Sequence, residues 1–182
     1  MIKLNKKLNL GCGNDIRKNW INLDIIAKEG VNIIHNLNKL PLPFTDNFFD
    51  YILCIDVLEH INYFPLMNEL YRILKKKGIL RIKVPHFTSR SNYKDPSHIN
   101  QFSSNTFHYF VNEGNFAYKR NISFFSKIFI RLEIEQSKIF ILKYLLRLFY
   151  NKINKSYRNQ NKYERTFLRT FPCESIKIIL VK

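Results

Sequence analysis

Short apolar runs alternate with polar turns through the first half of the chain, a pattern typical of β-strands joined by tight connections. The runs that we interpret as strands cover residues 8–10, 22–25, 31–37, 49–56 and 79–85. The fourth run is almost continuously apolar, as expected for a buried strand of a parallel sheet. Residues 40–44 read Leu-Pro-Leu-Pro-Phe and are expected to form a rigid loop, because proline lacks the N–H that a central strand needs.

A helical stripe separates the last two of these strands. Apolar residues recur at Leu66, Met67, Leu70, Tyr71 and Leu74, which is the spacing of one helix face. Pro65 suits the first turn of this helix. The lysines at 75–77 suit its last turn, and Gly78 is a typical C-terminal stop. A strand, a helix and a strand in this order favour a parallel sheet with a right-handed crossover.

The second half of the chain has a different pattern. Residues 86–118 are polar and aromatic and are expected to form loops, residues 124–135 alternate as in a strand, and residues 138–150 are largely apolar at helical spacing. Residues 151–165 are basic and polar, and residues 175–181 form a final strand. We therefore predict an α/β fold whose sheet is mostly parallel and ends in an antiparallel C-terminal hairpin at its edge.

The composition fits one domain over residues 1–182. The chain is 46% hydrophobic, enough for a sizeable core, and lacks the roughly 18 consecutive apolar residues that predict a membrane span. Its three scattered cysteines favour a reducing compartment, so we expect a cytoplasmic protein. The net charge of +16 either marks an anionic partner or reflects a Lys- and Asn-rich composition. Because the basic residues are dispersed, we favour composition and expect no nucleic-acid partner.

The turn after the first strand suggests a cofactor site. Gly11 and Gly13 follow that strand, and Asp24 ends the next one. Glycines let a backbone approach a ligand closely, and an acid at the tip of the neighbouring strand can bind both hydroxyls of a ribose. A dinucleotide site would need a third glycine where Ile16 stands and an acid about 20 residues further on. A cofactor with adenosine but no pyrophosphate fits better, which points to S-adenosylmethionine. The alternative is an ordinary tight turn.

Several blocks of the chain resemble class I S-adenosylmethionine-dependent methyltransferases, of the type 11 subgroup. The blocks are residues 8–13, 22–24, 42–50, 56–60, 69–75 and 78–85. The resemblance implies a Rossmann-like fold in which residues 1–85 bind the cofactor and residues 86–182 supply substrate-side loops, a helical insert and edge strands. A narrower set of small bacterial and archaeal members, similar to enzymes of surface-polysaccharide or other small-molecule pathways, shares residues 85–87, 95–98, 107–110, 163–165 and 171–172.

The resemblance also implies roles for single residues. Gly11 and Gly13 would face the methionine part of the cofactor, and Asp24 would bind the ribose. Asn36 and Leu37 would hold adenine, although the family usually has Asp where Asn36 stands. The backbone of Ile55 and Asp56 would meet the cofactor's amino group. In the polysaccharide-type members a basic pair tends to follow the Asp-Pro-x-His block, and Ile99-Asn100 replaces it here.

Methyl transfer needs alignment of two reactants and, where the acceptor must lose a proton, a base. His60, His86, His98 and Asp95 are candidates, since each is expected past the carboxyl end of a strand, where open sheets bind ligands. Alternatively, Glu59-His60 organises the entry to the helix, and Asp95 forms a turn stiffened by Pro96. We expect no metal site.

The acceptor that we expect is a small molecule or a glycan-pathway compound. Three alternatives stay open: a membrane-surface protein that uses the helix at 138–150, a nucleic-acid methyltransferase, and a protein that binds the cofactor without turnover. The pattern does not specify the oligomeric state.

Overall fold

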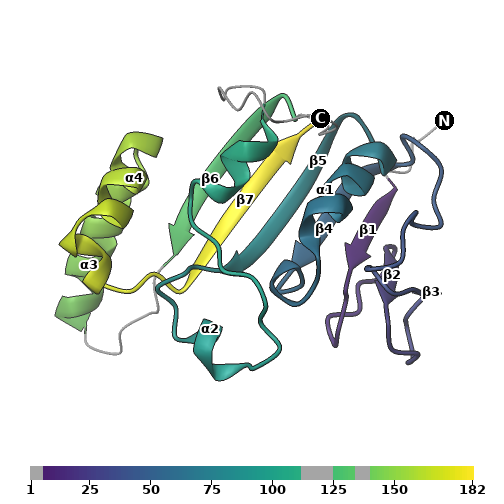
Figure 1. Cartoon of the computed structure of the whole chain (residues 1–182), viewed down its shortest axis with the longest axis horizontal. Helices are drawn as coiled ribbons and strands as arrows, with labels where there is room; N and C mark the ends of the chain where they lie inside the picture. The colour runs from purple at the N-terminus through teal and green to yellow at the C-terminus, as the bar shows by residue number, and fades with distance from the viewer. Residues whose placement is uncertain (1–5, 112–124, 134–139) are drawn as a thin grey trace.

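A seven-stranded sheet organises the computed structural model, which describes residues 6–111, 125–133 and 140–182 (Figure 1). The strand order is β3-β2-β1-β4-β5-β7-β6. The strands are β1 (Lys7–Leu10), β2 (Ile21–Asp24), β3 (Ile33–Ile34), β4 (Phe49–Ile55), β5 (Leu74–Pro85), β6 (Lys127–Glu133) and β7 (Ser175–Val181). The helices are α1 (Tyr63–Ile73), α2 (Ser91–Lys94), α3 (Phe140–Ile153) and α4 (Tyr157–Arg165). Three 3₁₀ helices complete the described elements: η1 (Leu58–His60), η2 (Thr106–Phe110) and η3 (Phe167–Thr170).

The pairing of the strands confirms the predicted fold class. Strands β1 to β5 are parallel to one another, whereas β7 runs antiparallel to both β5 and β6. The expected C-terminal pair is therefore present, with β6 at the edge and β7 inside it. Because the parallel strands share a direction, the carboxyl ends of β1, β2, β3 and β4 lie at the same end of the sheet.

Two predicted boundaries were wrong in the first half. The third strand was expected over 31–37, but β3 comprises only Ile33–Ile34, because the amide of Asn38 bonds to the side chain of Asn36 and turns the chain. The helix was expected to continue through the lysines to Gly78, but α1 ends at Ile73. The amides of Asn47 and Phe48 bond to the carbonyls of Arg72 and Ile73, so residues before β4 satisfy the orphan groups at the helix end. Lys75, Lys76, Lys77 and Gly78 lie in β5 instead.

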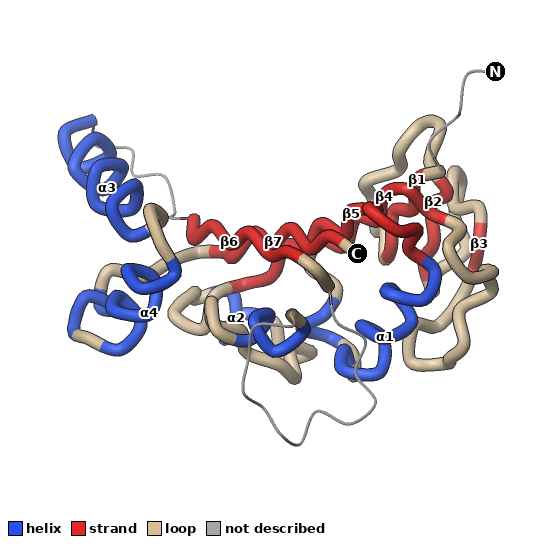
Figure 2. The backbone as a smooth tube through the Cα atoms, turned by 90° about the horizontal axis from the view of Figure 1, so that it is seen from above, coloured by secondary structure: helices blue, strands red, loops and turns tan. Residues whose placement is uncertain are grey.

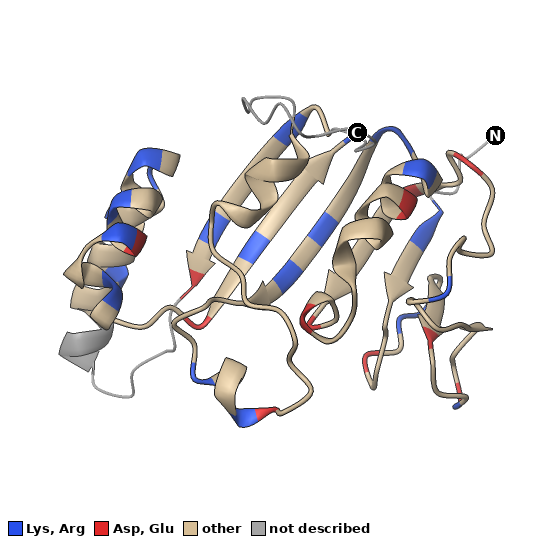
Figure 3. Cartoon of the chain, viewed as in Figure 1, with Lys and Arg blue, Asp and Glu red and all other residues tan. Residues whose placement is uncertain are grey.

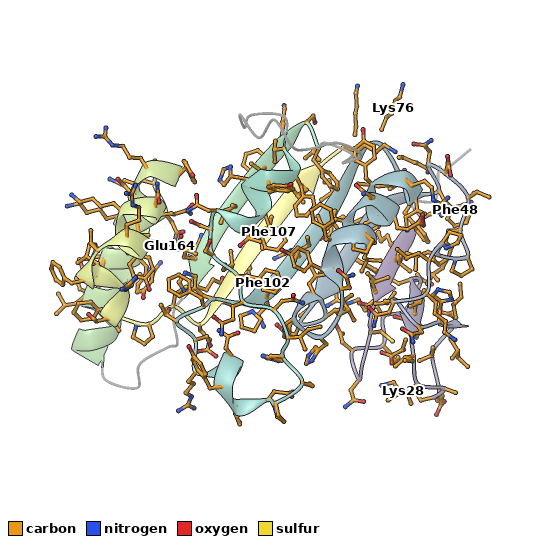
Figure 4. All side chains as sticks on the ribbon, in the orientation of Figure 1. Lys28, Phe48, Lys76, Phe102, Phe107 and Glu164 are labelled. Atoms are coloured by element: carbon orange, nitrogen blue, oxygen red, sulfur yellow. The ribbon has the colours of Figure 1, made fainter. Side chains whose placement is uncertain are left out.

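One face of the sheet carries most of the covering structure. In Figure 2, α1, α2 and the loops around them lie on one side of the sheet, and α3 and α4 lie beyond its β6 edge. Phe102 and Phe107, labelled in Figure 4, are fully buried in the covering layer and stack with ring centroids 5.6 Å apart.

Among the described residues, no helix covers the central strands on the other face (Figure 2). This is unusual, since parallel sheets are generally covered on both faces. Side chains on β5 explain why this face can stay uncovered by helices. Leu80, Ile82 and Val84 are buried, whereas Arg81 is exposed and Lys83 is half-buried. Lys177 on β7 continues this basic band, and the charged strand positions are visible in Figure 3.

The two helices between β6 and β7 form a unit at the sheet edge. The helix predicted at 138–150 is present over its described part and continues to Ile153 as α3, where Tyr150 and Ile153 are buried. Helix α4 was missed because residues 151–165 are so polar. It begins after Ser156, whose side chain accepts a hydrogen bond from the amide of Asn159, as an N-cap should. Within the described part of the chain, no helix has the length and apolar character needed to cross a membrane.

Candidate functional site

The glycine turn has the backbone geometry that the sequence suggested. Gly11 and Gly13 have φ angles of 61° and 52°, in the left-handed region that favours glycine. A Cβ on Gly11 would lie 2.5 Å from Cγ2 of Val57, so this glycine allows the turns after β1 and β4 to pack. A Cβ on Gly13 would meet no atom within 4 Å. Gly13 therefore borders open space in which a ligand can approach the backbone.

Asp24 lies beside this turn. Its Oδ2 accepts a hydrogen bond of 2.7 Å from the amide of Gly13, and its Oδ1 accepts one of 3.1 Å from the amide of Ile26. Burial alone would raise the pKa of Asp24, but the amides of Ile26 and Gly13 and the charge of Lys28 lower it. The group is therefore an anion at neutral pH. The Sγ of Cys12 is a further donor to Oδ2, at 3.9 Å, so the carboxylate is held beside the glycine turn.

An asparagine network replaces the helix that normally joins two parallel strands. The Nδ2 of Asn9 donates to the carbonyl of Asp15 and to Oδ1 of Asn22, at 2.6 and 3.2 Å. The amide of Asn22 donates in turn to Oδ1 of Asn32. Asn9 and Asn22 are both buried, so these bonds satisfy groups that would otherwise be costly to bury. The sequence analysis missed this network, although each of the three asparagines lies in or beside a predicted strand.

The other predicted cofactor residues follow neighbouring strands. Asn36 is half-buried after β3, and the side chain of Leu37 is in the core, so only the backbone of Leu37 remains available. Ile55 ends β4, and Asp56 has a φ of 53° and forms an ion pair of 3.0 Å with Lys83. Lys28, labelled in Figure 4, lies in the loop after Asp24 and donates to Asn14. The assignment of these residues to the cofactor stays a prediction.

A cleft of about 620 Å³ lies beside the carboxyl ends of β4 and β5. Its lining combines residues of the turn after β4, the end of β5, the segment at 91–98 and the start of β7: Asp56, Glu59, Lys83, Pro85, Ser91, Lys94, Asp95, Pro96, His98, Glu174 and Ser175. Most of these side chains are polar or charged. The cleft thus offers hydrogen-bonding and charged groups to a polar molecule.

Two predicted catalytic histidines meet at this cleft. The rings of His60 and His98 lie edge to face with centroids 4.6 Å apart. Ser97 joins His60 to Asp95: its Oγ lies 2.9 Å from Nδ1 of His60 and donates to Oδ1 of Asp95 at 2.6 Å. Hydrogen bonds from the side chain and the amide of Ser97 lower the pKa of Asp95. The structure thus brings together all three residues predicted for catalysis, and their catalytic role stays a prediction.

Glu59 is the residue of this cluster that the sequence analysis undervalued. Only 1% of Glu59 is exposed, and neither carboxylate oxygen has a hydrogen-bond partner. Burial raises the pKa of Glu59 to about 7. The alternative interpretation, that Glu59 organises the start of the helix, accounts for its backbone, whose carbonyl accepts hydrogen bonds from Ile99 and Asn100. It does not account for the side chain.

Asn100 explains why the loop holds its position without a basic pair. Its Nδ2 donates to the carbonyl of Leu58 at 2.9 Å and to the carbonyl of Ile61 at 2.7 Å. These bonds fasten the loop that carries His98 to the turn that carries His60. Asn100 therefore has a structural role at this position.

Comparison with known proteins agrees with this geometry. Residues 12–82 match the family model of a methyltransferase domain of the type 11 family. This match starts within the glycine turn and runs to β5. The sheet has the fold of class I S-adenosylmethionine-dependent methyltransferases. The predicted fold is thereby confirmed, and the family-model match over residues 12–82 supports the predicted resemblance and cofactor class.

Solved structures with low sequence identity share the fold of this chain. An S-adenosylmethionine-dependent methyltransferase of Archaeoglobus fulgidus is 17% identical with a TM-score of 0.60, and the match covers 99% of this chain and 87% of that one. One from Mesorhizobium loti is 10% identical with a TM-score of 0.55, over 100% and 94% of the two chains. A phosphoethanolamine N-methyltransferase of Haemonchus contortus, solved with S-adenosylmethionine, is 18% identical with a TM-score of 0.58, over 100% and 50%.

A relative with higher identity covers a short segment. An uncharacterized protein of Methanocaldococcus jannaschii is 60% identical over 47 residues, which are 26% of this chain and 21% of that protein. The match thus spans about a fifth of the relative's length.

His86 is the one candidate base that the structure removes from the cleft. It is fully buried, and its Nε2 lies 3.2 Å from Oε1 of Glu164 while its Nδ1 lies 2.7 Å from Oγ1 of Thr88. The prediction for His86 was wrong because the end of β5 directs this side chain under α4, whose Glu164 is labelled in Figure 4. Glu164 also accepts the amide of Ser104 at 2.6 Å. This pair joins distant parts of the chain.

Proposed function

We propose that the chain transfers a methyl group from S-adenosylmethionine to a small-molecule or glycan-pathway acceptor. The observation that carries the proposal is the pairing of Gly13 with the Asp24 carboxylate beside open space. An adenosine ribose would lie against Asp24, and the methionine part would cross the turn at Gly11 and Gly13. Exposed apolar side chains beside Asp24, those of Ile25 and Ile26, suit the face of an adenine ring.

The polar cleft would receive the acceptor. A bound sulfonium supplies both the methyl group and its leaving group, so the protein's part is to align the acceptor and to exclude water. Lys83, Lys94 and Glu174 line the cleft and would bind a molecule with several hydroxyl, carboxyl or amino groups. His60 and His98, held by Asp95 and Ser97, would take up the proton of an acceptor hydroxyl or ammonium.

Calorimetry with S-adenosylhomocysteine, the demethylated product, tests the cofactor site. Asp24→Asn keeps one oxygen that accepts from Gly13 but replaces the other with a donor. Because hydrogen bonds to a charged group contribute about 1.5–3 kcal/mol, the substitution should weaken binding by roughly 10- to 100-fold. Glu29→Gln removes the same charge from an exposed position and should leave the affinity unchanged.

Equal affinities in the two variants would contradict the assignment of Asp24. Absence of any binding by the wild-type chain would contradict the proposed function as a whole. If the product binds but tritiated S-adenosylmethionine labels no small-molecule or glycan acceptor, the chain binds the cofactor without turnover.

A membrane-surface role stays a second candidate because of one observation on α3. Tyr144, Leu145 and Leu148 are each at least half exposed on this helix, next to a basic α4. Flotation with anionic vesicles distinguishes this role from a purely dissolved enzyme.

A further inference from the structure

Three potential metal ligands converge at the wall of the polar cleft. Glu59 and His60 come from η1, and His98 comes from the loop after α2. One ligand atom from each of these residues lies within 4.8 Å of the others. Residues almost 40 positions apart in the chain thus present a carboxylate and two imidazoles to one point.

The burial of these groups points to a missing partner. Both carboxylate oxygens of Glu59 and Nδ1 of His98 are buried without a hydrogen-bond partner. Buried polar groups are generally hydrogen-bonded, and buried charges are paired or coordinate metals. Three unpartnered atoms within one small cluster are therefore unfavourable as they stand. A cation between them would satisfy all three.

The hydrogen bonds of His60 leave its other nitrogen free for such a cation. Ser97 has one hydroxyl proton, and it donates this proton to Asp95. The same Oγ must then accept from Nδ1–H of His60, 2.9 Å away. Neutral His60 is consequently protonated at Nδ1 and carries its lone pair on Nε2.

Asp95 lies near the second nitrogen of both histidines. It reaches His60 through Ser97, and its Oδ2 lies 4.0 Å from Nε2 of His98. Histidines that bind metals commonly direct their second nitrogen to a carboxylate, which fixes the ring orientation. Here that arrangement leaves Nε2 of His60 and Nδ1 of His98 for the ion.

We propose that Glu59, His60 and His98 bind one divalent transition-metal ion, of the kind represented by Zn²⁺. Two imidazoles and one carboxylate suit Zn²⁺ or Co²⁺ better than Mg²⁺ or Ca²⁺, which prefer oxygen ligands. Metal–ligand bonds of about 2.0–2.2 Å require the ligand atoms to move roughly 1 Å closer to one another, which rotation of the side chains would supply. This proposal replaces the expectation that the chain has no metal site.

Three protein ligands leave a coordination position open, and Glu59 and His98 both line the cleft. An acceptor hydroxyl at that position would release its proton to solvent in the cleft more readily, since the ion acts as a Lewis acid. The histidines then serve as ligands and not as bases. This consequence rests on the proposed function, whereas binding of the ion does not.

Calorimetric titration with Zn²⁺ tests the site in the untagged full chain after removal of metals with a chelator. We expect one ion per chain with a Kd below about 1 µM, in line with protein zinc sites, and a visible absorption band when Co²⁺ is used. Substituting a residue that only orients a ligand lowers metal affinity about 10- to 100-fold. Asp95→Asn should fall in that range, and Glu59→Gln and His98→Gln should lose at least as much.

His108→Gln is the matched control, because His108 lies on η2 outside the cluster. It should leave the Zn²⁺ affinity and the Co²⁺ spectrum unchanged. Binding that Glu59→Gln and His98→Gln do not weaken, or no binding at all, would overturn the proposal. Calorimetry with S-adenosylhomocysteine on the same samples shows that each variant is folded, and retained product binding without Zn²⁺ binding refutes the metal site alone.

Discussion

Two glycines in one turn are needed for different reasons. Both have a positive φ, but a Cβ added to Gly11 would meet Val57, whereas one added to Gly13 would meet no atom within 4 Å. The first is therefore constrained by packing within the protein, and the second by the space beside it. A sequence pattern of two glycines does not separate these roles.

Alanine substitutions separate them. Gly11→Ala adds backbone strain of about 1–3 kcal/mol and a clash of similar size, so the free energy of unfolding should fall by roughly 2 kcal/mol or more. Gly13→Ala adds the strain alone and should destabilise less, but it fills the space assigned to the cofactor. Urea denaturation and calorimetry with S-adenosylhomocysteine measure the two effects. Equal stability losses in the two variants would contradict this distinction.

Among the elements, α1 is tied to the loop before β4 by a charged network. Arg72 bonds to Glu69 and forms an ion pair of 2.6 Å with Asp46, and Glu69 accepts the amide of Leu42. Glu69 is 13% exposed at its side chain. The hydrogen bonds from Arg72 are the main reason that its pKa is lowered, and burial opposes them.

This network should make the stability depend on pH in the acid range. A carboxyl whose pKa is lower in the folded state stabilises the fold above its unfolded pKa of 4.5, and this contribution is lost as the pH falls through the folded pKa. The free energy of unfolding of the wild type should therefore exceed that of Glu69→Gln by about 1–3 kcal/mol at pH 7. This difference should shrink below pH 4.5. Urea denaturation across this range measures it.

Asp46→Asn provides the comparison for Glu69→Gln. The side chain of Asp46 is 68% exposed, so its ion pair should contribute only about 0–1 kcal/mol. A difference between wild type and Glu69→Gln that stays constant down to pH 3 would show that the charge of Glu69 is not what stabilises the loop.

At the scale of the whole molecule, a buried pair joins the last third of the chain to the middle third. Glu164 of α4 meets His86 at the end of β5 and the amide of Ser104. Tyr163 beside it is fully buried and donates to the carbonyl of Phe171. Within the narrower family set, residues 163–164 thus meet His86 and Phe171 in the core, whereas the segment at 95–98 lines the cleft.

Glu164→Leu should destabilise the fold by about 2–4 kcal/mol, because it leaves His86 and the amide of Ser104 buried without their partner. The affinity of the folded protein for S-adenosylhomocysteine should not change, since the glycine turn and Asp24 lie in the other half. Arg165→Gln, an exposed neighbour on the same helix, should change the stability by less than about 0.5 kcal/mol. A loss of product affinity without a loss of stability would restore His86 as a site residue.

The sequence by itself determined what depends on neighbours in the chain. Turn glycines, the acid at the end of β2, the apolar periods of β4 and α1 and the final strand are local signals, and the structure contains each of them. The order of these blocks was also sufficient for the family. Local signals suffice here because backbone conformation and amphipathic period act over a few residues.

Only the tertiary structure decided which distant residues meet. It ended α1 at Ile73 through amides that precede β4, and it withdrew His86 from the cleft by placing Glu164 against it. It also brought His98 to Glu59 and His60, which the sequence separates by almost 40 residues. Such contacts depend on how the strands order and how helices pack on them, and no periodicity within the chain encodes that arrangement.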